Sequence, residues 1–311
     1  MTIDNSLFVK DRTAFLFPNH GSAYMINQFS KISAIYYGLL QSGYDFYTYE
    51  RSNDHIKKIQ AYCKPELSSA FFSQARQNTC DVYPYWPRAF IMEAATFLLN
   101  DDNTGFQDFG VFRQKIMSTS NISERERDDT LWTWLADFPH ELDSVLSDDS
   151  FSEYLQWEGE WISEQKDVYR DELHLIQNCL EACIDLYHSP VQRIQICINP
   201  IKCVYSSDYH LLGDCFVFSS GLLRADSIIH EFLHHVVHPF VEQQKTLVLE
   251  YKPVNDQIDQ SYYLSDNNAG LINAFEETVV RLLTEEIMNG KYPNNLLAYI
   301  EHCLIQMKSG K

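Results

Sequence analysis

Apolar residues recur three and four positions apart over most of residues 22–165, where short polar segments separate them. This spacing is typical of helices that bury one face. Residues 123–126 and 150–153 have the serine and glutamate spacing of a capping box, which marks a helix N-terminus. Residues 161–188 extend the same pattern and are predicted to form one long helix. The N-terminal half is therefore expected to be helical.

The C-terminal half begins with a different pattern. Residues 192–198 alternate, with Ile194, Ile196 and Ile198 on one side, as in a strand. Residues 214–219 form a second short apolar run between two glycines. We expect the strand just before the next helix to line a cleft, where its edge would pair with an extended peptide.

Two helices are predicted after these strands. The first covers residues 227–238, with Asp226 and Ser227 as candidate N-caps and Pro239 as its end. The second covers residues 268–289 and ends at a glycine.

The pattern as a whole predicts a mostly helical α+β fold. A small sheet is expected next to the helix of residues 227–238, together with a helical N-terminal half. We expect residues 1–165 to form a helical region packed directly on a second part, residues 166–311, although a boundary anywhere between about 120 and 190 fits the pattern.

Composition indicates a folded globule. The 311 residues are 45% hydrophobic and 14% aromatic, which is too apolar for a disordered chain. The net charge of −19 opposes binding to nucleic acids and anionic membranes, because no run of lysine or arginine offsets it. No segment approaches the roughly 20 apolar residues that a membrane span requires.

Two features favour a cytoplasmic protein. The N-terminal segment has no basic region followed by an apolar core, so no signal peptide is predicted. The eight cysteines include no CxxC pair, which favours reduced thiols. Export by a leaderless route, or removal of a leader, would also fit the sequence.

The motif His230-Glu231-Phe232-Leu233-His234 is the strongest chemical signal in the chain. On a helix, residues four apart share one face, so both imidazoles can bind one metal ion. Zinc suits such a site because it accepts nitrogen and carboxylate ligands and, in catalytic sites, keeps a fourth position for water. Glu231 would lie beside that water, where it can accept a proton.

A third protein ligand is expected from another segment. His238 lies eight residues after His230, which is about 12 Å along a helix and too far for one ion, so we expect it at the helix end. Within residues 268–289, Glu276 borders the apolar stripe, whereas Glu277 lies roughly opposite it. Since a ligand must face the metal and not the core behind its own helix, Glu277 is the predicted ligand and Glu276 is assigned a structural ion pair.

His230, Glu231, His234 and Glu277 together resemble the gluzincin zinc peptidases, the thermolysin-like HExxH…E group. In that group the ligand glutamate lies on a separate helix, with apolar residues two before it and two, five and six after it. The corresponding positions here are Phe275, Val279, Leu282 and Leu283. The chain is also similar to a bacterial metallopeptidase-like family of unknown function. The resemblance covers about residues 190–290.

The chain departs from the group at two positions near the ligand. The group often has an asparagine just before the glutamate and an aspartate four residues after it, where this chain has Glu276 and Arg281. This departure removes the usual hydrogen-bond partner of a zinc histidine.

The resemblance implies a Zn²⁺-dependent peptidase that acts on a peptide or protein, with Glu231 as general base. Arg281, Tyr263, Tyr262 and His210 are candidates for stabilising the transition state or contacting substrate, and the sequence does not separate them. Two alternatives are a catalytically silent zinc-binding or interaction module and a metallohydrolase of non-peptide amides. Retention of Glu231 argues against the silent module, because a structural site needs no base.

Overall fold

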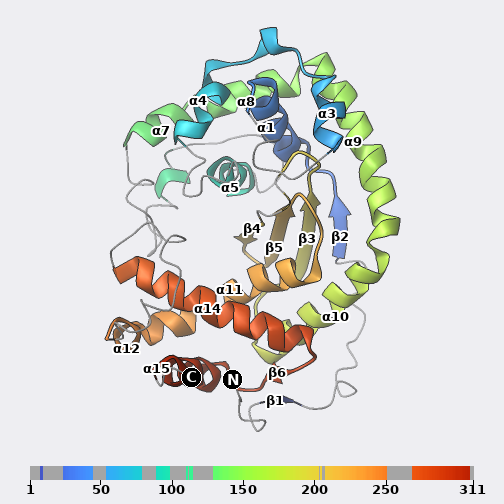
Figure 1. Ribbon diagram of the computed structural model, residues 1–311. Helices are drawn as coiled ribbons and strands as arrows, with labels where there is room; N and C mark the ends of the chain where they lie inside the picture. The colour runs from blue at the N-terminus through green and yellow to red at the C-terminus, as the bar shows by residue number, and fades with distance from the viewer. Residues whose placement is uncertain are drawn as a thin grey trace. The chain divides into compact units, whose positions relative to one another are not determined.

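The computed structural model confirms a mostly helical α+β fold with a small four-stranded sheet (Figure 1). None of the helices in the described part of the chain is long and apolar enough to cross a membrane. The residues that the structure describes are 8–9, 24–44, 54–78, 89–98, 110, 112–114, 129–202, 204, 207–250 and 268–308.

The chain divides into two compact units, and each is assembled from segments that are separate in the sequence. The first unit comprises Met1–Tyr24, Arg170–Arg193 and Arg224–Lys311, and the second comprises Met25–Tyr169 and Ile194–Leu223. The division expected from the sequence, at residue 165, has a single boundary. The observed units differ because Ile194–Leu223, which carries most of the sheet, belongs to the same unit as the helical N-terminal region.

The second unit contains the sheet and most of the helices. The strand order is β2-β3-β5-β4, from Tyr24–Asn27, Arg193–Ile198, Cys215–Ser220 and Asp208–Leu212 respectively. The helices are α1 (Ser30–Gln41), α3 (Asp54–Gln60), α4 (Ala70–Asn78), α5 (Phe90–Leu98), α7 (Asp129–Leu135), α8 (Phe138–Leu146) and α9 (Asp149–Val168).

Both predicted strands are present, as β3 and β5, but the expected free edge of β5 is wrong. β5 lies between β3 and β4, so both of its edges are already paired. β4 and β5 form a hairpin in which Leu212 pairs with Cys215, and Gly213 adopts a φ of 59° in the two-residue turn. That positive φ suits glycine, because it has no Cβ to clash.

A buried ionic network in the second unit joins α5, which carries Glu93, to β4, which carries Asp208 and His210. Lys202, whose side chain is 1% exposed, places Nζ 2.9 Å from Glu93 Oε1 and 2.7 Å from Asp208 Oδ2. The other Glu93 oxygen lies 3.3 Å from His210 Nε2, and Tyr36 donates its hydroxyl to Glu93. Burial raises the pKa of Glu93, but Lys202 and His210 lower it to about 2. These charges therefore compensate one another inside the core.

The first unit contains two packed central helices and a two-stranded sheet. In this sheet β1 (Phe8–Val9) pairs antiparallel with β6 (Tyr292–Pro293). The helices are α10 (Arg170–Leu186), α11 (Ala225–Gln243), α12 (Lys245–Leu249), α14 (Asn268–Met288) and α15 (Leu296–Lys308). As predicted, α14 is followed by a glycine in the left-handed region, Gly290, with a φ of 76°.

Several of the predicted helix ends are wrong. The long helix expected over residues 161–188 is divided between α9 and α10, with Tyr169 at the junction. The N-cap of α9 is Asp148, whose side chain accepts the Ser150 N–H, so Ser150 lies inside the helix. The capping box predicted at residues 123–126 lies outside the described residues.

Another error concerns α11, which does not end before Pro239. Proline has no N–H to donate to the His235 carbonyl, but the helix continues to Gln243. Val236, Val237 and Val241 on either side of the proline are buried. Packing of this apolar face thus outweighs the lost hydrogen bond, and the helix remains intact.

Candidate metal centre

The candidate ligands lie on α11 and α14, which pack side by side in the first unit (Figure 1). The apolar residues of α11 between the two histidines, Phe232 and Leu233, are fully buried, which leaves His230 and His234 on a partly exposed face. On α14, Phe275 and Val279 are likewise buried, and Glu277 is directed away from them. The helical periodicity thus places polar ligand types on facing sides of the two helices.

The start of α11 is fixed by another helix of the same unit. Asp226 and Ser227 are not the N-cap, because the helix already begins at Ala225. The Ala225 N–H donates to Glu172 Oε1 of α10 at 2.5 Å. This carboxylate satisfies an orphan backbone donor and complements the positive end of the helix dipole.

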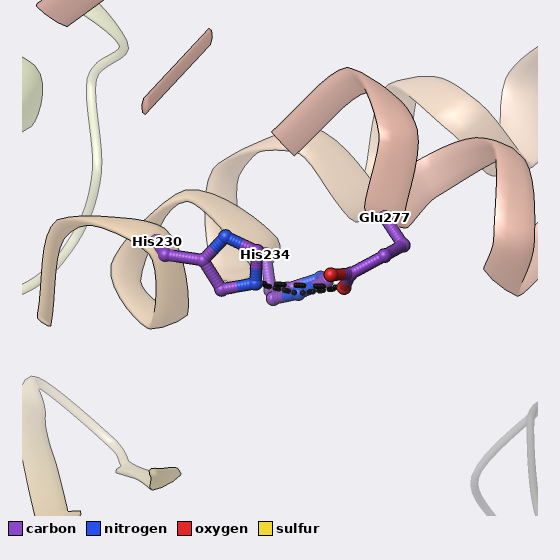
Figure 2. A group of neighbouring side chains, drawn as sticks. All are labelled: His230, His234 and Glu277. Carbon is purple, nitrogen blue, oxygen red and sulfur yellow. Dashed lines mark hydrogen bonds and ion pairs between the residues drawn. The ribbon is translucent and has the colours of Figure 1, made fainter. Parts of the chain in front are cut away.

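His230, His234 and Glu277 come together at one point, as Figure 2 shows. The separations are 3.3 Å between the two Nε2 atoms, 3.4 Å from His230 Nε2 to Glu277 Oε2, and 3.2 Å from His234 Nε2 to Glu277 Oε2. A tetrahedral zinc ion with bonds of about 2.0–2.1 Å holds its ligand atoms about 3.3–3.4 Å apart. The three atoms therefore fit one face of a zinc tetrahedron.

The fourth corner of that tetrahedron has no protein ligand among the described residues, since the metal-ligand group found there contains only these three. Structural zinc sites normally use four protein ligands, whereas catalytic sites use three and leave one position for water or substrate. Two imidazoles and one carboxylate are a donor set that occurs in three-ligand zinc sites.

Glu276 has a larger role than the surface ion pair expected from the sequence. Its Oε1 lies 2.8 Å from His234 Nδ1, and its Oε2 lies 2.7 Å from His238 Nδ1. Its side chain is 9% exposed. A carboxylate on the far nitrogen of a metal-binding histidine fixes the tautomer and orientation of the ring. The departures from the group pattern suggested that the zinc histidine had lost its usual hydrogen-bond partner. In the structure, Glu276 itself is that partner for His234.

His238 was expected at the end of its helix, but it lies inside α11, one turn beyond His234. The sequence contained a signal for this arrangement. His230, His234 and His238 are spaced four residues apart, which places all three on one helix face. A third histidine on that face is too far away to join the same ion, but it is close enough to share a carboxylate with its neighbour.

Arg281 contacts the candidate ligand Glu277. Its Nε donates to Glu277 Oε1 at 2.6 Å, while Glu277 Oε2 faces the two histidines. One oxygen is thus held by the guanidinium and the other remains for a metal. Arg281 itself is 57% exposed, so this contact alone contributes little to the stability of the fold.

The carboxylates strongly favour a charged His234. Burial lowers the pKa of His234, but its hydrogen bonds with Glu276 and Glu277 and the charge of Glu231 raise it to about 10. Burial raises the pKa of Glu277, but hydrogen bonds and charge from His230 and His234 bring it well below its usual range. Since a metal needs the neutral imidazole lone pair, metal binding must displace the His234 proton.

The remaining candidates are placed as follows. Glu231 is partly exposed on α11. His210 is buried in the second unit beside Glu93, so its imidazole has a partner within that unit. Tyr262 and Tyr263 lie outside the described residues, and their suggested contact with substrate stays a prediction.

No family model, no curated protein and no solved structure matches the chain.

Proposed function

We propose that this chain is a zinc-dependent peptidase whose metal is held by His230, His234 and Glu277. The observation that carries the proposal is the spacing of the three ligand atoms, which lie 3.2–3.4 Å apart where α11 packs against α14. The HExxH motif and the position of Glu277 support the same conclusion, through their resemblance to the gluzincin group. Peptides are the proposed substrates on that resemblance.

Each residue then has a separate task. His230 and His234 present their Nε2 atoms and Glu277 presents Oε2, while Glu276 and Arg281 hold two of these ligands in orientation. A zinc ion held by these residues would polarise a carbonyl as a Lewis acid and would lower the pKa of a coordinated water to about 7. Glu231, on the turn between the two histidines, accepts a proton from the attacking water and passes it to the leaving amine.

Zinc content is the first test. Purified protein should contain about one zinc per chain, as measured by elemental analysis. Glu277→Ala should lower this content because only two protein ligands remain. Protein that takes up no transition metal, even after zinc is added, would refute the proposal.

Cleavage of a peptide library, with and without chelator, is the second test. Glu231→Gln should retain zinc but lower kcat by about 10²- to 10⁴-fold, because the amide cannot accept the proton. Glu242→Gln is the matched control. Glu242 also lies on α11 but pairs with Lys245 at 3.3 Å, so its replacement should leave cleavage unchanged.

The alternatives predict different results in the same experiments. A catalytically silent zinc module would bind zinc and cleave nothing in the library. A hydrolase of non-peptide amides would cleave small amide substrates in a chelator-sensitive way and leave peptides intact.

A further inference from the structure

A third histidine is linked to the candidate metal centre by a shared carboxylate. Glu276 directs one oxygen to His234 Nδ1 at 2.8 Å and the other to His238 Nδ1 at 2.7 Å. Both histidines belong to α11, whereas Glu276 belongs to α14. The bridge therefore ties one residue of α14 to two successive turns of α11.

The hydrogen-bonding roles follow from the chemistry of the three groups. An ionised carboxylate has no donor, so each ring must donate from Nδ1. A histidine that donates from Nδ1 has Nε2 available as a ligand atom. His234 Nε2 is the atom that lies 3.3 Å from His230 Nε2 and 3.2 Å from Glu277 Oε2. The contact with Glu276 thus sets which nitrogen of His234 faces the site.

We propose that His238 is a positioning residue of the metal centre and acts through Glu276. A carboxylate held at one oxygen can still turn about its last side-chain bond, whereas a contact at each oxygen fixes its plane. Because Glu276 precedes Glu277 on the same helix turn, the bridge also fixes the register in which Glu277 meets the two ligand histidines. His238 thus influences two of the three ligands without touching the metal.

This inference rests on the proposed metal site but goes beyond the HExxH…E pattern, which has no third histidine of this kind. His235 supplies a useful contrast. It lies on the same helix, but its Nε2 is 3.2 Å from Ser189 Oγ, whereas the two Glu276 oxygens contact His234 and His238. Its replacement alters α11 without disturbing the bridge.

The test compares two amides at position 238. In His238→Asn the amide nitrogen lies near the place of Nδ1 and can still donate to Glu276. In His238→Gln the donor is one bond further out, near the place of Nε2. Zinc affinity is measured by competition with a chromophoric chelator. Cobalt substitution reports ligand geometry through the visible absorption bands of the bound ion.

His238→Gln should weaken zinc binding by about 10- to 100-fold and shift the cobalt bands, as loss of outer-shell partners does. His238→Asn should remain within about threefold of wild type, because it retains the donor to Glu276. His235→Asn should bind both metals as the wild type does. A merely structural role for His238 would lower the unfolding midpoint but leave the cobalt spectrum unchanged.

Two outcomes would overturn the inference, and they can be told apart. If the wild type binds zinc and cobalt and His238→Gln matches it in affinity and spectrum, the positioning role alone is wrong. If the wild type binds neither metal, the proposed function falls as well.

Discussion

The protonation of His234 in metal-free protein is the most direct physical test of the site's electrostatics. Glu276 and Glu277 both hydrogen-bond to this ring, and together with Glu231 they raise its pKa to about 10 despite its burial. The unperturbed value for histidine is about 6.5. We therefore predict that His234 remains charged at pH 8 after zinc is removed by chelation.

The magnitude follows from the size of the shift. Raising the pKa of His234 from 6.5 to about 10 corresponds to about 5 kcal/mol of stabilisation of the charged form in the folded state. Because the folded pKa is the higher one, this contribution is fully present below about pH 6.5 and is lost as the pH rises through about 10. Metal-free protein should therefore lose stability from pH 7 to 10 through this residue.

Zinc must compete with the same proton. Over the range in which His234 is charged, the apparent zinc affinity should rise by about tenfold for each pH unit, as expected for release of one proton. The dependence should flatten near pH 10. A histidine with an ordinary pKa would instead show this slope only below about pH 6.5.

Imidazole ¹⁵N chemical shifts of metal-free protein, followed from pH 6 to 10, measure this directly. Glu276→Gln removes one of the two hydrogen-bonded carboxylates, so the midpoint of His234 should move down. A wild-type midpoint near 6.5 would show that the carboxylates do not hold the ring as described, and the argument for Glu276 would fail with it.

Three further predictions concern other parts of the chain. Glu277→Gln should lose zinc at lower chelator concentrations than Glu276→Gln, since it removes a ligand and not a ligand's partner; the reverse order in one titration would be evidence against the assigned ligand. Lys202→Met should lower the unfolding free energy by about 3–5 kcal/mol, because it leaves Glu93 and Asp208 buried without their cation; urea denaturation measures this, and a loss below about 1 kcal/mol would contradict it. Most of the eight thiols should react under denaturing, non-reducing conditions, since the described cysteines form no disulfide; a low thiol count would indicate otherwise.

Periodicity in the sequence was sufficient for the fold class and for the local elements of the site. The apolar stripe of α14 identified Glu277 as the residue that faces away from its own helix core, and the structure brings it to His230 and His234. The strands β3 and β5 and the glycine after α14 followed from alternation and from helix-end chemistry. These features depend on neighbours within a few positions, which a sequence displays directly.

The features that were missed depend on partners far away along the chain. Glu172 caps α11 from a position 53 residues earlier, and Glu276 meets His238 from a position 38 residues later. Neither separation has a period that can be recognised in the sequence. Pro239 was assigned as a helix end because its missing N–H is a local property, whereas the packing that overrides it is tertiary.

The pairing of β1 with β6 has a consequence for synthesis of the protein. Val9 lies opposite Tyr292, so the first strand of this unit must wait for its partner until the chain has been made as far as Tyr292. At about 5–20 residues per second, this wait is about tens of seconds. The second unit, which ends at Leu223, can fold during that interval. The unit with the candidate metal centre is therefore completed only after all residues of the second unit have been made.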